Sequence, residues 1–206
     1  MLHVEDLLLP HKKRLNLTLE KNSVQFVQGP NGSGKSLALK SLATFFPATF
    51  KKFDFNGKSI ESWNYQEYRS LVTYCSPVPW IPMTGKVEEF MKAPFTLQIR
   101  NKIQPTSLID TQKFLHDWKL TGLDLAHLSS GQRQGLALLR AMTMNSEILL
   151  LDEVFSHLDR ENTLAMEEAL LKWQQATQGT LLMVSHDIAQ PIRMGGRVLH
   201  TNEILS

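Results

Sequence analysis

The chain carries the octapeptide Gly29-Pro30-Asn31-Gly32-Ser33-Gly34-Lys35-Ser36, which fits the phosphate-loop pattern G-x-x-x-x-G-K-[ST]. Its glycines allow a tight turn that brings backbone N–H groups close to phosphate oxygens. Lys35 supplies a positive charge for the β- and γ-phosphates, and the hydroxyl of Ser36 is a suitable ligand for Mg²⁺. A helix that begins near Ser36 points its positive end at the anion. The octapeptide predicts a phosphate-binding loop, and the alternative is a glycine-rich turn without a ligand.

The residues on both sides of this loop supply the context that the mechanism requires. Val24-Gln25-Phe26-Val27 is a short, largely apolar strand candidate directly before the loop. The segment 37–46 has apolar residues at helical spacing, and Pro47 is expected to stop that helix. Because strand, glycine loop and helix follow in this order, a bound phosphate is favoured over an empty turn.

The bulk properties limit the class of protein. A length of 206 residues suits one α/β domain, and 42% hydrophobic with 20% charged residues predicts a buried core. The net charge of +2 is too small to predict nucleic-acid binding, so no nucleic-acid partner is expected. A single cysteine, Cys75, excludes an intrachain disulfide and is compatible with a reducing compartment. No run of about 18 apolar residues and no secretory signal pattern are present.

Hydrophobic patterning along the chain predicts alternating strands and helices. Leu15, Leu17 and Leu19 alternate with polar residues as in a half-buried strand, so residues 1–28 are expected to form short strands. Further strands are expected at 53–55, 71–75, 148–151, 180–184 and 198–200. Helices are expected at 111–120, 130–144 and 160–175. The pattern predicts an α/β fold, with a mainly parallel sheet covered by helices and antiparallel strands near the N-terminus.

Prolines interrupt the pattern in the middle of the chain. Pro82, Pro94 and Pro105 divide residues 81–126 into short pieces. We expect an inserted helical lobe in this part of the chain.

An apolar strand that ends in two acids is the second chemical motif. Ile148-Leu149-Leu150-Leu151 is followed by Asp152 and Glu153. In phosphate-loop NTPases an acid at this strand end holds Mg²⁺ or its waters, and we assign that role to Asp152. Glu153 is then the candidate general base that polarises the attacking water. The alternative is a buried strand that ends in ordinary capping acids.

Three more segments extend the pattern to a known family. Leu128-Ser129-Ser130-Gly131-Gln132 resembles the L-S-G-G-Q signature of ABC-type ATPases, and Gln132 lies 20 residues before Asp152. Ser156-His157-Leu158-Asp159 resembles the D-loop of that family, and Val184-Ser185-His186-Asp187 resembles its H-loop. Together with the phosphate loop and the acid strand, these motifs follow the family order over essentially the whole chain.

The resemblance implies a fold, a cofactor and a mode of assembly. The fold is that of a P-loop NTPase of the ABC-ATPase type, a single domain over 1–206, with an ATP-binding core at 1–78 and 136–206 and a helical signature subdomain at about 79–135. ATP and Mg²⁺ are the implied cofactors. Ser129, Gly131 and Gln132 close on ATP held by a second ATPase subunit, most simply an identical one, and His186 contacts the γ-phosphate with Glu153. The alternatives are a plain helix cap at Ser129 and an ordinary turn histidine at His186.

The chain departs from the family pattern at four positions. A glutamine that senses Mg²⁺ is usual where this chain has Pro77, and proline offers no side-chain donor or acceptor. Ser130 replaces a glycine of the signature, and Gly135 replaces a frequent arginine. An aromatic ring that stacks on adenine is usual upstream of the phosphate loop, and residues 7–11 offer only His11 there. The nucleotide-binding and acidic residues are all present, so an active ATPase is expected.

The expected function is that of an ATPase subunit which powers an ABC transporter through separate transmembrane permease subunits, at the cytoplasmic face of the membrane. A docking surface for the permease is expected around 79–94, and the candidate residues are Trp80, Ile81, Met83, Phe90 and Phe95. The alternative for these side chains is simple core packing. Two segments, 72–75 and 94–101, resemble the ATP-binding subunit of a bacterial iron exporter, which suggests metal export. The alternatives are a soluble ABC-type ATPase that acts on ribosomes, DNA or protein complexes, and a phosphate-loop kinase or GTPase.

Overall fold

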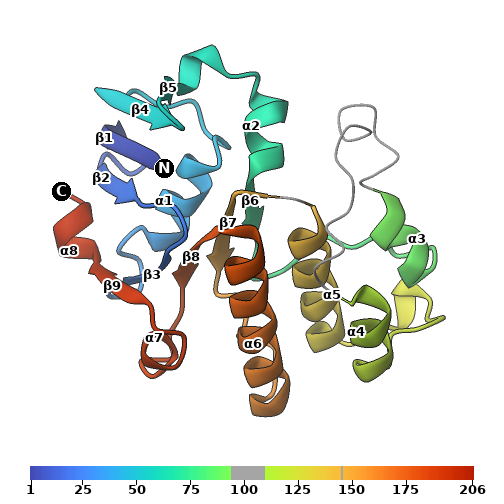
Figure 1. Ribbon diagram of the computed structural model, residues 1–206. Coiled ribbons are helices and arrows are strands. Elements are labelled where there is room, and N and C mark those ends of the chain that lie inside the picture. The colour runs from blue at the N-terminus through green and yellow to red at the C-terminus, as the bar shows by residue number, and fades with distance from the viewer. Residues whose placement is uncertain (94–109, 145) are drawn as a thin grey trace.

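Two sheets form the framework of the computed structural model, which describes residues 1–93, 110–144 and 146–206 (Figure 1). The antiparallel sheet has the order β2-β1-β4-β5, from strands β1 (Leu2–Leu8), β2 (Arg14–Leu19), β4 (Lys52–Phe55) and β5 (Lys58–Ser59). The parallel sheet has the order β6-β7-β8-β3-β9, from strands β3 (Val24–Gln28), β6 (Val72–Cys75), β7 (Ile148–Asp152), β8 (Thr180–Val184) and β9 (Arg197–His200). The predicted division into N-terminal antiparallel strands and a parallel sheet is confirmed.

Both faces of the parallel sheet are buried, which explains its continuous apolar strands. In β7, Ile148 and Leu150 pack into a core with the antiparallel sheet, whereas Leu149 and Leu151 pack into a second core with the long helices. Consecutive side chains of a strand point to opposite faces, so one strand supplies both cores. The acids at 152–153 follow at its carboxyl end.

Eight α-helices are present in the described residues. They are α1 (Lys35–Leu42), α2 (Tyr65–Leu71), α3 (Val87–Lys92), α4 (Thr111–Asp117), α5 (Ser130–Thr143), α6 (Arg160–Thr177), α7 (Gln190–Arg193) and α8 (Thr201–Ile204). Asn64, Asp110, Ser129 and Asp159 accept hydrogen bonds from the first N–H groups of α2, α4, α5 and α6 respectively, as good N-cap residues do. None of the helices described is long and apolar enough to cross a membrane.

Some sequence expectations need correction. The helix after the phosphate loop ends at Leu42 rather than running to Phe46, because Thr44 has a left-handed backbone with φ 59°. Pro47 therefore does not stop it. The short helices α2, α3, α7 and α8 were not expected, since pieces of four to seven residues show little periodicity.

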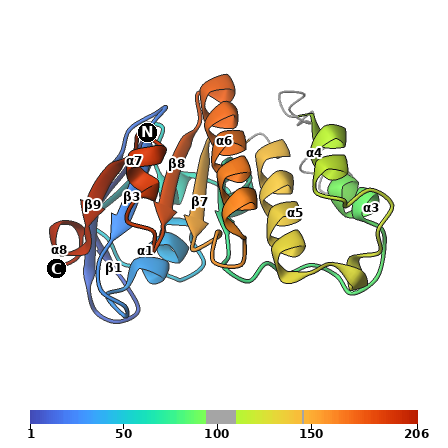
Figure 2. The same ribbon diagram turned by 90° about the horizontal axis from the view of Figure 1, so that it is seen from below.

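A helical lobe lies at the end of the molecule away from the antiparallel sheet (Figures 1 and 2). It contains α3, α4 and the beginning of α5, and its buried residues join the core on one face of the parallel sheet. The boundary expected between residues 135 and 136 falls inside the continuous helix α5. The lobe and the core therefore share this helix.

Gly135 leaves room for an aromatic side chain of the lobe. A Cβ at Gly135 would lie 2.1 Å from Cζ3 of Trp118, whose ring stacks on Phe114 with a centroid distance of 4.8 Å. Gly135, which stands where the family often has arginine, thus allows α4 and α5 to pack closely.

Gly135→Ala is expected to destabilise the protein, although alanine is the better helix former by about 1 kcal/mol. Overpacking against Trp118 should exceed that gain and give a net loss of about 1 kcal/mol in urea unfolding followed by circular dichroism. In a Trp118→Ala background the same change should be stabilising. If it stabilises the protein with Trp118 in place, the packing account is wrong.

Candidate nucleotide site

The phosphate loop leaves the first N–H groups of α1 without side-chain partners. The helix begins after Gly34, whose φ of 106° is in the left-handed region, and it has no side-chain cap and no acidic residue in its first turn. Gly32 also has a positive φ, of 74°. These conformations favour glycine. The helix start is accordingly an anion-binding arrangement of free N–H groups and a positive dipole end.

Lys35 lies across the loop and not in solvent. Only 6% of the residue is exposed, and its Nζ donates to the carbonyl oxygens of Gly29 at 2.8 Å and Pro30 at 3.0 Å. These contacts hold the ammonium group inside the loop, where a phosphate would lie beside the N–H groups of α1. Pro30 and Gly29 thus contribute through their backbone.

The C-terminal helix supports the loop from behind, a feature that spacing along the sequence does not reveal. A Cβ at Gly29 would lie 2.1 Å from Oγ1 of Thr201, at the start of α8. A Cβ at Gly34 would lie 3.6 Å from Cδ1 of Leu205, which pairs with Leu15 of β2 in an isolated bridge. Gly29 is therefore needed for close packing against Thr201.

Ser36 and Asp152, the two residues assigned to Mg²⁺ from the sequence, lie side by side in the structure. Oγ of Ser36 donates to Oδ1 of Asp152 at 2.9 Å, and the hydroxyl of Tyr74 donates to Oδ2 at 2.8 Å. Only 1% of Asp152 is exposed. A buried carboxylate beside a serine hydroxyl is a set of hard oxygen donors, so these residues fit Mg²⁺. Tyr74 was not among the predicted site residues, because nothing in its spacing points to Asp152.

Glu153 and His186 also meet, from the ends of neighbouring strands. Nε2 of His186 lies 2.9 Å from Oε1 of Glu153, and the backbone N–H of Glu153 donates to the carbonyl of Val184 at 3.0 Å. Glu153 has a left-handed φ of 49°, which is strained for a residue with a side chain. The backbone turn after β7 directs this carboxylate toward the histidine.

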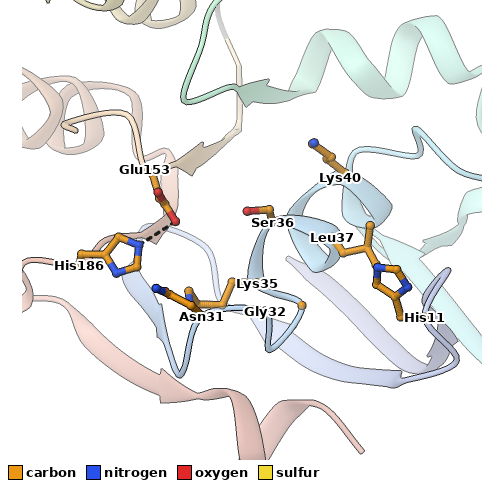
Figure 3. Close-up of a pocket in the computed structure, with 10 residues that line it drawn as sticks. His11, Asn31, Gly32, Lys35, Ser36, Leu37, Lys40, Glu153 and His186 are labelled. Atoms are coloured by element: carbon orange, nitrogen blue, oxygen red, sulfur yellow. Dashed lines mark hydrogen bonds and ion pairs between the residues drawn. The ribbon is translucent and has the colours of Figure 1, made fainter. Parts of the chain in front are cut away.

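These parts surround one cavity of about 490 Å³. Figure 3 shows Ser36 between the Glu153–His186 pair on one side and Leu37 with His11 on the other. The cavity is lined by His11, Asn31, Gly32, Gly34, Lys35, Ser36, Leu37, Lys40, Glu153 and His186. Leu37 and Lys40 were not predicted as lining residues, although their place one turn into the helix after the loop could have indicated them.

The signature segment does not line this cavity. Oγ of Ser129 accepts from the N–H of Gln132 at 3.2 Å, and Oε1 of Gln132 accepts from the N–H of Ser129 at 3.1 Å, which forms a capping box. A Cβ at Gly131 would lie 3.0 Å from the carbonyl oxygen of His157. Within one chain these residues therefore cap α5 and pack on the segment after β7.

A charge network around the buried Glu167 holds the segment that carries His186. Arg193 of α7 contacts Glu167 of α6 at 2.6 Å and Asp187 at 2.7 Å. Gln190 donates to the same Glu167 at 2.9 Å. Glu167 is buried, so its carboxylate depends on these partners.

Arg193→Gln is expected to lower the free energy of unfolding by about 3 kcal/mol, because it leaves the buried Glu167 without its cation. The matched control is Lys172→Gln, which breaks the exposed pair with Glu168 and should leave the free energy of unfolding nearly unchanged. Denaturant unfolding of both variants measures the difference. Equal effects of the two changes would contradict the assigned role.

The ion pair between Arg193 and Asp187 makes the stabilisation by Arg193 depend on pH. The Arg193 guanidinium, followed by the N–H of Ala189, lowers the pKa of Asp187. A lowered folded-state pKa stabilises the fold above the ordinary carboxyl value of about 3.9, and this stabilisation is lost as the pH falls through the lowered value. The difference in the free energy of unfolding between the wild type and Arg193→Gln should therefore become smaller as the pH falls.

Comparisons with known proteins agree with the geometry. A family model described as ABC transporter matches residues 12–156. The taurine import ATP-binding protein TauB of Escherichia coli is 32% identical over 189 residues, which cover 90% of this chain and 71% of TauB. The "Probable iron export ATP-binding protein FetA" of Escherichia coli is 28% identical over 175 residues, which cover 84% of this chain and 76% of FetA.

Solved structures show the same fold. An ATP-binding subunit of an ABC transporter superposes with a TM-score of 0.78 at 19% identity, covering 99% of this chain and 88% of that chain. A dimeric ATP-binding cassette in a post-hydrolysis state with ADP and Pi has a TM-score of 0.78 at 20% identity, covering 97% of this chain and 94% of that chain.

Proposed function

Because the chain belongs to the ATP-binding subunits of the ABC transporter family, which are ATPases, we propose that it powers transport through partner permease subunits by ATP-driven dimer closure. The observation that carries the proposal is the single cavity in which the phosphate loop, Ser36 and the Glu153–His186 pair meet, with Asp152 bonded to Ser36. A kinase or GTPase would leave this pair and the signature segment without a role.

In this proposal each side chain has a defined task. The N–H groups of the loop and the ammonium of Lys35 bind the phosphates of ATP. Ser36 and Asp152 would hold Mg²⁺, which when bound neutralises charge on the phosphates. Glu153 accepts the proton of the attacking water, and His186, at 2.9 Å from its carboxylate, orients that base and contacts the γ-phosphate.

The dimer is proposed because the signature residues have no place at their own chain's cavity. Ser129 and Ser130 are exposed and Gly131 is partly exposed, at the N-terminus of α5. A second copy, placed head to tail, would bring this helix start and its Ser129, Gly131 and Gln132 against the bound triphosphate. ATP then joins two surfaces, and its hydrolysis releases them.

The core and the lobe have separate tasks in this proposal. We assign ATP binding to 1–78 and 136–206 and signature presentation to about 79–135, with α5 as the helix that joins them. Movement of the lobe would then change the place of the signature relative to the partner's ATP.

The permease is proposed to dock beside the lobe, on the segment after β6. Trp80 is 80% exposed and lines a cavity of about 200 Å³ between β6, α3 and α5, and Val78 and Met83 are exposed as well. The other candidates differ: Ile81 and Phe90 are buried in the core, and Phe95 lies outside the described residues. An exposed tryptophan beside a cavity supports a contact with a membrane subunit, at the cytoplasmic face.

Isolation of the full chain from its native cells tests this function. We expect a polytopic membrane protein to co-purify, and ATP hydrolysis to rise when both are reconstituted in lipid vesicles. Trp80→Ala should weaken that association. The control is Trp63→Ala, because Trp63 packs against Phe55 of the antiparallel sheet and not on the proposed docking surface. Isolation with ribosomes or DNA instead would favour a soluble ABC-type ATPase and contradict the transporter role.

For the cargo we propose a metal ion such as iron, exported by the complete transporter. The similarity to FetA supports this choice, and one of the two segments that suggested it, 94–101, lies outside the described residues. ATP-dependent movement of Fe²⁺ across vesicles that contain both subunits is the expected result. Movement of taurine and not of Fe²⁺ would contradict it.

A further inference from the structure

Tyr74 connects β6 with the acid at the end of β7. The two strands are neighbours in the parallel sheet (Figure 1), and the tyrosine hydroxyl donates to Oδ2 of Asp152 at 2.8 Å while Ser36 donates to Oδ1. Both oxygens of the buried carboxylate are therefore held. The ring of Tyr74 packs edge-on against Phe45 with a centroid distance of 5.4 Å, which fixes its direction.

The hydroxyl of Tyr74 is a donor over the physiological range. A neutral phenol has one proton to donate, and the structure directs it to the carboxylate of Asp152.

The same residue lines the cavity proposed for the permease. That cavity is bounded by Tyr74, Ser76, Trp80 and Arg140, among others. Pro77, two residues beyond β6, has no side-chain donor, and the contact from α5 to this segment is made by Gln134, whose Nε2 lies 3.4 Å from the carbonyl oxygen of Ser76. Tyr74 therefore makes a direct polar contact between the residues that line this cavity and the candidate metal site.

We propose that Tyr74 is a positioning residue that orients Asp152 for Mg²⁺ and links the permease-docking cavity to that carboxylate, a task that the side chain at 77 cannot perform. The proposal rests on the proposed function. Groups that hold a metal-binding carboxylate from outside affect metal affinity, typically by 10- to 100-fold. A change at Tyr74 should therefore act on the metal and leave the phosphate loop intact.

Tyr74→Phe removes only the hydroxyl and keeps the ring beside Phe45. With protein in excess over ATP, we expect the dissociation constant of Mn²⁺ from the protein–ATP complex, followed by electron paramagnetic resonance, to rise about tenfold. The ATP affinity measured in EDTA should stay within twofold. The matched control is Tyr68→Phe, which removes a buried hydroxyl bonded to the carbonyl of Leu42 and should leave Mn²⁺ affinity unchanged.

Unchanged or tighter Mn²⁺ binding by Tyr74→Phe would overturn the proposal, as would an equal loss of ATP affinity in EDTA. Failure of the wild type to bind ATP at all would instead overturn the proposed function. The two failures are thus distinguishable.

A measurement on the wild-type sequence tests the role of Tyr74 even if Tyr74→Phe does not fold. The chain has three tyrosines, so a 3-fluorotyrosine protein gives three ¹⁹F signals, which Tyr65→Phe and Tyr68→Phe assign. Addition of Mg²⁺ to the ATP complex should shift the Tyr74 signal and leave the Tyr68 signal in place. A Tyr74 signal that does not move would refute the link.

Discussion

Replacing Lys35 by alanine is expected to abolish ATP binding, with at least a 100-fold loss of affinity in calorimetry. Hydrogen bonds to charged groups contribute about 1.5–3 kcal/mol each, and Lys35 is the buried cation of the loop, held by the carbonyls of Gly29 and Pro30. A loss of about 3 kcal/mol corresponds to roughly 100-fold in affinity.

The control for Lys35→Ala is Lys58→Ala, which removes the same charge from an exposed position on β5. It should leave ATP affinity within twofold, because exposed charges far from the site are screened by salt. Circular dichroism would establish that Lys35→Ala is folded. Retained ATP affinity in the folded variant would contradict the assignment of the phosphate loop.

The second large effect is expected for Glu153→Gln, which should bind ATP and hydrolyse it at least about 100-fold more slowly. Glutamine removes the negative charge but keeps the shape, so the strained backbone at φ 49° and a contact with His186 can persist. Because ATP is not split, the dimer should accumulate. Size-exclusion chromatography with light scattering in the presence of ATP measures that state.

Glu168→Gln serves as the matched control, since it removes one carboxylate from the exposed face of α6. Its hydrolysis rate and its elution should equal those of the wild type. Normal hydrolysis by Glu153→Gln would show that Glu153 is not the base. Slow hydrolysis with no dimer would leave Glu153 as the base and contradict the head-to-tail assembly.

Much of the site could be predicted because its parts depend on neighbours along the chain. The glycines of the phosphate loop, the helix that follows and the apolar strand before Asp152 all have local patterns, and the structure places them as expected apart from the earlier end of α1. The capping box of Ser129 and Gln132 also follows from spacing, since its two hydrogen bonds span three residues.

Other features could not be predicted because they join segments that are distant in sequence. Tyr74 and Asp152 are 78 positions apart, and only the pairing of β6 with β7 brings them together. The close approach of Thr201 to Gly29 and of Trp118 to Gly135 likewise depends on how α8 and α4 pack. A glycine in a sequence indicates conformational freedom, whereas the side chain that needs the space is visible only after folding.

The motifs and their order along the chain were sufficient to predict the ABC family and the α/β architecture and to propose residues for phosphate and metal, because each motif depends on short-range spacing. The tertiary structure alone decided that Glu153 faces His186, that Tyr74 holds Asp152 and that the signature lies away from its own chain's cavity. These relations arise from strand order and helix packing, which bring together atoms that no local pattern relates.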